Sequence, residues 1–398
     1  MSSDKDIFYD LLQGGVLLIY LDNAASSWPK PDCVTKAMEN YLKDFSANPG
    51  RSGHKLARLA GNVVLSTRQR LAALINSPSS ERIVFTLNAT EALNTAILGI
   101  VKPKDHVITT SMEHNSILRP LNFAAKQGVE VEIVACDGNG LVDPEKIKSA
   151  MKRNTKLIAL GHASNVTGTI QPIQEIGEIA READVPFLLD AAQTAGAVSI
   201  DVQKQNVSLL AITGHKSLLG PQGTGALYVA DGLTVNPLKY GGTGSYSELE
   251  EQPYEFPDYL ESGTLNGVGI AGLGAALSYI EERGLSEIIN HKKDLIFQLI
   301  SGLAAINNIK IYGHVNGVGA VPVVSFSIIG CDSSEIAFIL DSVYDIAVRP
   351  GLHCAPLAHK TIGTFPEGTI RVSLSVFNNK EEIAAFISAI REIVKDMT

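Results

Sequence analysis

Hydrophobic and polar positions alternate in blocks through the first two-thirds of the chain. Short apolar runs, each bounded by polar residues or glycine, have the length of buried strands. Several of them are continuously apolar, which is typical of a sheet covered by helices on both faces. The pattern predicts strands at Ile83–Thr86, His106–Thr110, Val131–Ala135, Lys156–Leu160, Phe187–Asp190, Leu209–Thr213 and Ala226–Val229.

Segments between these strands have helical spacing. Apolar residues recur on one side between Leu56 and Ile75, and again across Gln174–Arg181. Alternating strands and helices predict an open α/β sheet. In such sheets ligands bind in the loops that follow the carboxyl ends of the strands.

The pattern changes near Tyr240. Residues 241–257 are rich in Gly, Glu and Pro and predict a long loop. A loop of this length inside a folded protein is usually functional. Helical spacing returns at Val268–Arg283, and two later apolar segments, Val321–Ile328 and Thr369–Ser373, predict strands.

This change divides the chain into two expected domains. We expect a large domain over residues 21–262 and a smaller C-terminal domain over residues 263–398. Residues 1–20 are expected to pack against the smaller one. The length of 398 residues suits two or three domains.

Composition narrows the class of protein. The 33 Lys and Arg against 42 Asp and Glu leave a net charge of −9, which lacks the positive field of a nucleic-acid binder. No apolar run approaches the roughly 20 residues of a membrane helix, and the acidic N-terminus lacks the basic segment of a secretory signal. Four cysteines are too few for a disulfide framework. We therefore expect a cytoplasmic protein that binds neither membrane nor nucleic acid.

Candidate site residues lie at the ends of three predicted strands. The first is the segment PFLLDAAQ, in which Asp190 ends an apolar strand and Gln193 follows three residues later. A carboxylate at the mouth of a buried strand needs a partner, because desolvating an unpaired charge is costly. A helix N-cap or a structural ion pair would also explain Asp190.

The second strand end is the segment LLAITGHKSLLGPQGTGALYV. Here an apolar strand runs into Thr213, Gly214, His215 and Lys216. Most lysines are solvated, but a lysine at a strand mouth is a candidate for a low-pKa amine that forms a Schiff base. The glycines that follow lack the order of a nucleotide-binding loop, and a strand rather than a helix comes after them.

The third strand end is the segment FTLNATEALNTAI. A strand ends at Thr86, and Asn88 to Glu91 begin an apolar helix. Backbone amides at a helix N-terminus bind anions, and Thr90 adds a hydroxyl; a simple helix cap would use the same residues. An acid, a lysine and an anion-binding helix start are together the parts that hold pyridoxal phosphate (PLP).

Eight segments carry a resemblance to a known family. In order they are LDNAAS, SMEH, ASNVTGT, LLDAAQTAG, TGHKSLLGPQGTGALY, ESGTLN, RPGLHCAP and IRVSLSVFNN. They resemble the class V aminotransferase family of fold-type I PLP enzymes, and within it the group of cysteine desulfurases and selenocysteine lyases. The resemblance implies an α/β fold, with a mostly parallel seven-stranded sheet in the large domain and a smaller C-terminal α+β domain.

The resemblance also implies roles for single residues. By it, Lys216 forms the Schiff base, Asp190 pairs with the pyridinium nitrogen, and Gln193 bonds the ring hydroxyl. His114 stacks on the ring and aids proton transfer. Thr90, Thr213 and His215 bind the phosphate, as does Thr264 from the neighbouring subunit, which implies a homodimer. Asn165 and Arg371 hold the substrate carboxylate, and Arg349 faces anionic groups beside them.

The chain departs from the family at three places, one of which is conservative: Thr213 stands where relatives often have serine. Ala89 stands where relatives often have a hydroxyl residue, which weakens one phosphate contact or leaves it to the backbone. The run AHKTIGTFPEGTIR differs from the best-known members, which puts the identity of the sulfur acceptor in doubt more than the chemistry.

Cys354 is the candidate nucleophile. It lies in a loop marked by Pro350, Gly351 and Pro356, beside His353 and near Arg349, a setting that favours thiolate. A buried inert thiol is the usual fate of cysteine, and we expect it for the other three. Zinc on His353, Cys354 and His359 is disfavoured because only one sulfur is present, and we expect no metal.

The resemblance thus implies that PLP-bound L-cysteine is converted to L-alanine and that its sulfur forms a persulfide on Cys354. An acceptor then takes the sulfur, for iron–sulfur cluster assembly, tRNA thiolation or another use. Three alternatives remain open: a selenocysteine lyase acting on L-selenocysteine, a transaminase of a small amino acid, and a silent subunit that only docks sulfur-transfer partners.

Overall fold

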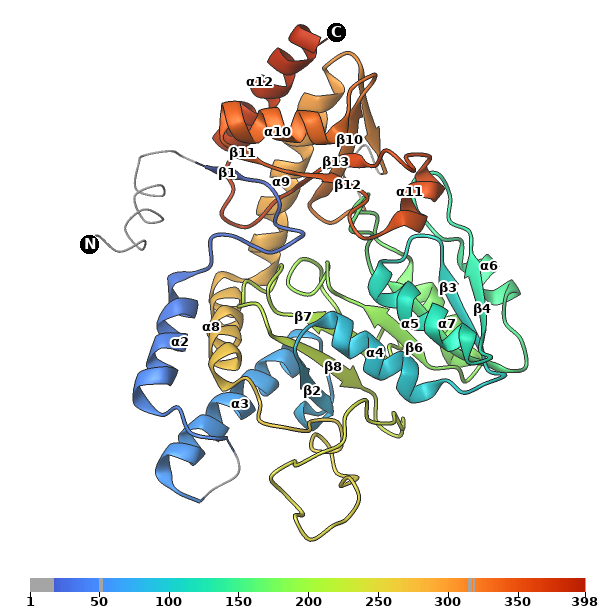
Figure 1. Cartoon of the computed structure of the whole chain (residues 1–398), viewed down its shortest axis with the longest axis vertical. Coiled ribbons are helices and arrows are strands. Elements are labelled where there is room, and N and C mark those ends of the chain that lie inside the picture. Colours follow the sequence, from blue (N-terminus) through green and yellow to red (C-terminus); the bar gives the residue numbers. More distant parts are fainter. Residues whose placement is uncertain (1–17, 50–52, 314–316, 318, 398) are drawn as a thin grey trace.

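A seven-stranded sheet forms the centre of the larger part of the molecule (Figure 1). The computed structural model describes residues 18–49, 53–313, 317 and 319–397. The strand order is β2-β8-β7-β6-β5-β3-β4, and every neighbouring pair is parallel except the two that involve β8. Its strands are β2 (Ile83–Thr86), β3 (His106–Thr110), β4 (Glu130–Val134), β5 (Thr155–Gly161), β6 (Phe187–Asp190), β7 (Leu209–Thr213) and β8 (Gly225–Val229). All seven predicted strands and the predicted fold class are confirmed.

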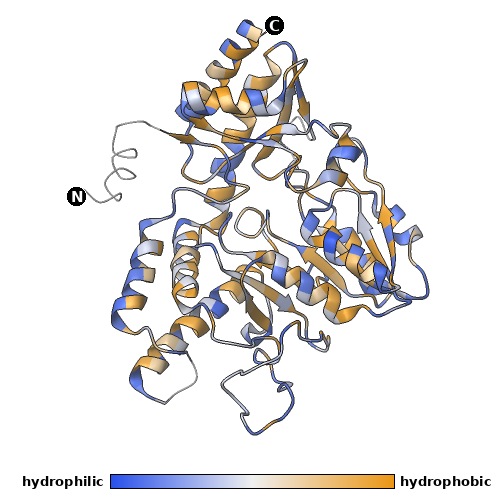
Figure 2. Ribbon diagram, in the orientation of Figure 1, coloured by the Kyte–Doolittle hydropathy of each residue, from blue (hydrophilic) through white to orange (hydrophobic). Residues whose placement is uncertain are grey.

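Alternate residues of these strands enter two different hydrophobic cores. In β6, Phe187 and Leu189 belong to one core and Leu188 to the other. In β7, Leu210 and Ile212 face the first core while Leu209 and Ala211 face the second. Both faces are buried, so successive residues must all be apolar. Figure 2 shows these strands as mainly hydrophobic.

Helices cover both faces of the sheet. One core is closed by α4 (Ala89–Ile100) and α5 (Asn115–Lys126), which supply residues such as Leu93 and Leu121. The other is closed by several helices, among them α3 (Lys55–Leu74), α6 (Pro144–Ser149), α7 (Ile173–Glu182) and α8 (Gly267–Arg283). The predicted helices near 56–75, 174–181 and 268–283 are therefore confirmed.

Helix α8 lies beyond the predicted domain boundary at residue 262. It packs against α2 (Asp32–Asp44) and α3, and its Leu273 and Leu277 belong to the core of the large sheet. The boundary stays a prediction. Between β8 and α8, residues 230–266 contain no helix or strand, which confirms the predicted long loop.

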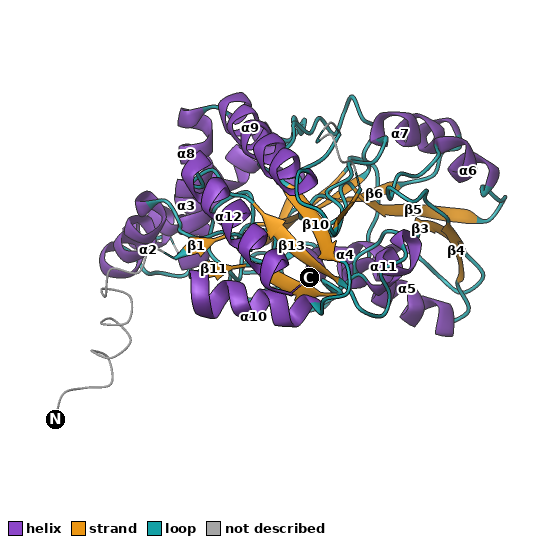
Figure 3. Ribbon diagram, turned by 90° about the horizontal axis from the view of Figure 1, so that it is seen from above, coloured by secondary structure: helices purple, strands orange, loops and turns teal. Residues whose placement is uncertain are grey.

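The C-terminal part is built on a second, antiparallel sheet. Its order is β12-β13-β10-β9, from β9 (Ile309–Tyr312), β10 (Val323–Ile328), β12 (Arg349–Gly351) and β13 (Thr369–Ser373). Three helices surround it, α9 (Leu285–Ala304), α10 (Ser333–Tyr344) and α12 (Lys380–Met397), and a short α11 (Pro356–Ile362) follows β12 (Figure 3). Between Ser80 and Arg82 the chain makes a single 3-10 turn, η1.

The described N-terminal segment joins this smaller part. Strand β1 (Ile19–Tyr20) pairs in parallel with β11 (Ile346–Ala347). We also predicted that residues 1–17 pack against the smaller part, but these lie outside the described residues. No helix in the described part of the chain is long and apolar enough to cross a membrane.

Candidate active site

Lys216 follows β7 at the carboxyl edge of the large sheet. The turn is possible because residue 214 is glycine: a Cβ there would lie 2.1 Å from the Thr224 hydroxyl oxygen. Burial, followed by the nearby cations Arg371 and Arg349, lowers the pKa of Lys216 to about 8, although Asp190 acts in the opposite direction. The amine therefore titrates near neutral pH, as a lysine used in chemistry must.

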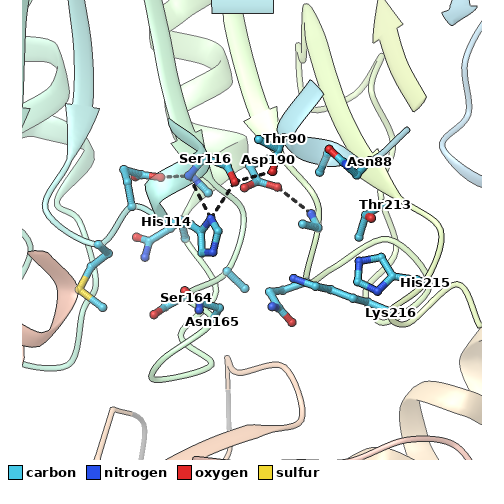
Figure 4. A pocket seen from close by; sticks show the side chains of 18 residues that line it. Asn88, Thr90, His114, Ser116, Ser164, Asn165, Asp190, Thr213, His215 and Lys216 are labelled. Atoms are coloured by element: carbon cyan, nitrogen blue, oxygen red, sulfur yellow. Dashed lines mark hydrogen bonds between the residues drawn. The ribbon is translucent and has the colours of Figure 1, made fainter. Parts of the chain in front are cut away.

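Asp190 ends β6 and faces the same cavity as Lys216 (Figure 4). Its Oδ1 accepts a hydrogen bond from the backbone N–H of Ala192 at 2.8 Å. Burial raises the pKa of Asp190, and the Ala192 N–H and the charge of Lys216 partly oppose this. A cationic donor placed against this carboxylate would restore the low pKa. Gln193 lines the cavity beside it and donates from Nε2 to the carbonyl oxygen of Ala24.

An anion-binding corner lies where α4 begins. Asn88 caps the helix by accepting from the Glu91 N–H at 2.9 Å, while Ala89 and Thr90 line the cavity. Two polar atoms of the same cavity wall, Thr213 Oγ1 and His215 Nδ1, are buried and have no hydrogen-bond partner among the residues that the structure describes. Buried polar groups are normally paired, so this corner fits a phosphate that the protein chain does not itself supply.

His114 is the N-cap of α5 and joins a chain of hydroxyl groups. Its Nδ1 accepts from the Ser116 backbone N–H at 3.0 Å, so the proton of the neutral ring lies on Nε2. The Ser116 hydroxyl, 2.9 Å from Nδ1, must then donate to it, and the Thr90 hydroxyl lies 2.8 Å from Ser116 Oγ. Burial, with the charges of Lys216 and Arg349 next, lowers the pKa of His114 to about 4. The imidazole is neutral at physiological pH.

Cys354 lies exposed on the loop between β12 and α11. The backbone of His353 and Cys354 has φ values of +51° and +60°, which non-glycine residues adopt only when their surroundings compensate the strain. Two contacts hold this loop: the Asn165 side chain donates to the His353 carbonyl oxygen at 2.7 Å, and the Asn115 N–H donates to the Cys354 carbonyl oxygen at 2.9 Å. A further donor, Arg349 Nη2, lies 3.6 Å from Cys354 Sγ. The thiol thus has a guanidinium beside it.

Arg371 lies on β13 and is 1% exposed. Its Nη2 pairs with Asp22 at 2.7 Å, and its Nη1 donates to the Asn165 carbonyl oxygen at 3.2 Å. Its Nε is buried and has no partner within the described part of the chain. Arg371 and Asn165 are therefore in direct contact, and one guanidinium nitrogen is free for a further acceptor.

Four predicted site residues do not line the cavity: Thr264, Arg349, Arg371 and Cys354. Thr264 is exposed and differs from the other three in that it lines a separate pocket, together with Glu91 and Lys239. The structure therefore brings together Thr90, His114, Asn165, Asp190, Gln193, Thr213, His215 and Lys216 as lining of one cavity. Arg349, Arg371 and Cys354 lie close enough to influence the pKa of Lys216. The roles of these residues stay predictions.

Three residues of the site region were not singled out from the sequence. Asp22 orients Arg371, and Ser116 links Thr90 to His114. Glu113 is buried in the cavity wall, where it accepts from the Thr110 hydroxyl and from the Gly161 N–H, and burial raises its pKa to about 8. Asp22 and Glu113 lie inside quoted motifs, whereas Ser116 has no signal in the sequence pattern.

Metal ligands are absent from the described part of the chain: it contains no group of three or more His, Cys, Asp or Glu side chains placed to hold an ion. His353 and His359 face each other with ring centroids 5.4 Å apart. Their bonded partners are hydroxyl groups, those of Thr369 and Thr364.

Fold and site together define a class of protein. Residues 19–386 match the model of the family described as Aminotransferase class-V. The chain belongs to this family, whose members are fold-type I enzymes that depend on PLP. The predicted family, fold and cofactor are confirmed.

The particular relatives have one name in common. A protein of Methanothermobacter thermautotrophicus named "Probable cysteine desulfurase" is 36% identical over 94% of each chain. One of the same name from Pyrococcus abyssi is 35% identical over 96% of this chain and 95% of its own. The solved apo structure of a cysteine desulfurase from Thermococcus onnurineus NA1 is 34% identical, covers 100% of this chain and 99% of its own, and has a TM-score of 0.90.

Proposed function

We propose that this protein is a cysteine desulfurase that converts L-cysteine to L-alanine and takes the sulfur onto Cys354. The observation that carries this proposal is the position of that thiol. Cys354 is exposed, has Arg349 Nη2 at 3.6 Å, and is tied through its carbonyl oxygen to the helix that His114 caps. A transaminase has no use for a thiol at this position.

The cavity fits PLP on the evidence of its unpaired groups. Thr213, His215 and the start of α4 would hold the phosphate, and Asp190 and Gln193 the ring. When bound to Lys216, the cofactor supplies an electron sink for the carbon skeleton of the substrate.

Lys216 would then move the substrate's proton. With a pKa of about 8, a useful fraction of this amine is neutral near pH 7 and can take a proton from Cα of cysteine. The same pKa lets the protonated amine release that proton again. Arg371 and Asn165 would bind the substrate carboxylate, and the Asp22 carboxylate keeps the Arg371 guanidinium oriented. The neutral His114, with its proton on Nε2, is placed as a donor rather than a base.

Cys354 would accept the sulfur. In its thiolate form it bonds to the substrate sulfur as the Cβ–S bond of cysteine breaks, and the electron pair of that bond stays with carbon. Proton uptake at carbon completes alanine, and Cys354 is left as a persulfide. Arg349 Nη2, 3.6 Å from Cys354 Sγ, is placed to donate a hydrogen bond to this sulfur.

The wider setting of the reaction is also proposed. A homodimer would bring Thr264, exposed in the single chain, to the phosphate of the partner's site. The persulfide would pass to an acceptor protein or thiol in the cytoplasm, which suits the exposure of Cys354, and iron–sulfur cluster assembly is one use of that sulfur.

One experiment tests the reaction. The PLP-loaded enzyme is incubated with L-cysteine, alanine is quantified, and the peptide that contains Cys354 is analysed by mass spectrometry. We expect a mass increase of one sulfur on Cys354 and one alanine per persulfide. A keto acid in place of alanine would identify a transaminase instead, and no product at all would favour a silent docking subunit.

A further inference from the structure

A segment near the start of the described chain contacts the connection that carries Lys216. Residues 26–30 lie between β1 and α2, and Lys30 reaches the backbone of His215, which is 185 positions away in sequence. His215 and Lys216 both line the catalytic cavity (Figure 4). A contact at this point can therefore act on the lysine of the site.

The contact centres on one atom, the carbonyl oxygen of His215. This oxygen accepts from the Ser27 backbone N–H at 2.9 Å and from Lys30 Nζ at 3.0 Å. The hydroxyl groups of Ser27 and Ser26 donate to the same oxygen at 3.2 and 3.3 Å. A carbonyl oxygen has two lone pairs, so donors from one short segment fill its whole capacity.

Lys30 differs from the other donors because it is charged. Its side chain is partly buried, and Nζ also donates to Ser27 Oγ at 2.7 Å. Burial lowers the pKa of Lys30 to about 8, so the ammonium form prevails at pH 7. A hydrogen bond from a charged donor is roughly twice as strong as one between neutral groups. The ammonium group therefore holds the His215 carbonyl more firmly than a neutral side chain could.

This bond acts on the backbone of Lys216. The carbonyl of His215 and the N–H of Lys216 belong to one planar peptide group. A donor that fixes the carbonyl therefore fixes this plane, and with it the direction in which Cα of Lys216 presents its side chain. On the other side of Lys216, its own carbonyl oxygen accepts from the Leu219 N–H at 2.9 Å. The backbone is thus held both before and after the reactive side chain.

We propose that Lys30 is a positioning residue of the reaction: its ammonium group holds the His215 carbonyl and so orients Lys216 towards the cavity. This inference rests on the function proposed above, in which Lys216 binds the cofactor and moves the substrate's proton. Lys30 itself does not line the catalytic cavity, so it acts through Lys216.

The first test follows Schiff-base formation without any cysteine. Apoenzyme is mixed with saturating PLP, and the absorbance change that accompanies bonding to Lys216 is recorded by stopped flow. Lys30→Met keeps the length of the side chain but loses the donor and the charge, and it should react at least about tenfold more slowly than the wild type. Lys30→Arg keeps both and should restore most of the rate.

The matched control is Lys36→Met, at an exposed lysine of α2 (Asp32–Asp44), which should react as the wild type does. Circular dichroism shows whether each variant is folded. If Lys30→Met does not fold, Lys30→Gln takes its place, because it also lacks the charge but keeps a polar side chain, and we expect the same loss of rate.

The second test separates positioning from substrate binding. In the PLP-loaded enzyme, Lys30→Met should lower kcat for L-cysteine at least about tenfold. The KM should stay nearly unchanged, since Arg371 and Asn165 are left in place to bind the substrate carboxylate.

Three results would each overturn the proposal: a wild-type rate of Schiff-base formation in the uncharged variant, a raised KM with unchanged kcat, or a loss that Lys30→Arg does not restore. Failure of the proposed function would be seen differently, as a wild-type enzyme that forms no persulfide on Cys354. The first test uses no substrate and is decided independently of that result.

Discussion

The backbone N–H of Asn115 donates a hydrogen bond of 2.9 Å to the carbonyl oxygen of Cys354. This bond joins the first turn of α5, on the large sheet, to the loop after β12, on the small one. It therefore places the exposed thiol next to the helix whose cap is His114. The predictions below concern the groups that this contact brings together.

Replacement of Cys354 by alanine should lower the rate of alanine formation from L-cysteine at least about a hundredfold, because the sulfur then has no acceptor. Cofactor binding should be unchanged, since Cys354 does not line the cavity. Alanine assays and cofactor absorbance check both points. The control is Cys33→Ala, at the exposed cysteine on α2, which should keep wild-type turnover.

The same variant separates the two candidate substrates. Selenide is a better leaving group than sulfide, so cleavage of L-selenocysteine should need Cys354 less. We expect Cys354→Ala to keep much of its selenocysteine lyase activity. Undiminished cysteine turnover in this variant would remove Cys354 from the mechanism.

Asp190→Asn should lower kcat at least about a hundredfold with little effect on cofactor retention. Asparagine keeps the size of the side chain and an acceptor for the Ala192 N–H, but it lacks the charge that would hold a protonated ring nitrogen. Steady-state kinetics and equilibrium dialysis of the cofactor measure the two effects. A variant with wild-type kcat would contradict the role of Asp190.

Arg371→Lys should raise the KM for L-cysteine at least about tenfold and change kcat much less. Lysine keeps the positive charge but has a single nitrogen. The Arg371 guanidinium has three, of which two contact Asp22 and Asn165 and the third is left for the substrate carboxylate. Arg391→Lys, at an exposed arginine of α12, is the matched control. A fall in kcat alone would place Arg371 in the chemical step instead of substrate binding.

His162→Gln should reduce the pH dependence of stability. Burial lowers the pKa of His162 from 6.5 to about 3, so between these values the unfolded chain binds a proton that the folded chain does not. The free energy of unfolding therefore falls as the pH drops, by about 1.4 kcal/mol per pH unit for this residue. Urea unfolding of the apoenzyme between pH 6.5 and 4.5 should show a shallower slope in the variant. An identical slope would mean that His162 is protonated equally in both states.

The local pattern of apolar and polar residues was sufficient to predict most strands of the large sheet. The strands at Ile83–Thr86, His106–Thr110, Phe187–Asp190 and Leu209–Thr213 have the predicted bounds, because their continuous apolar runs are buried on both faces. The ends of β4 and β5 shift by one residue, since polar and charged residues such as Glu130 and Thr155 lie at these strand ends. The packing of α8 is a different case: this helix follows the long loop in sequence yet contributes to the core of the large sheet, which no local pattern indicates.

The sequence by itself determined which chemical groups lie at the ends of which strands, because Asp190 ends its strand and because Lys216 and the start of α4 come within a few residues of theirs. Tertiary structure alone decided which of these groups meet. Asp22 and Arg371 are 349 positions apart and still form an ion pair, and the neutral state of His114 depends on burial and on cations from three other segments. Both relationships follow from how the chain packs, since the burial and the partners of a residue are properties of the folded chain and not of its neighbours in sequence.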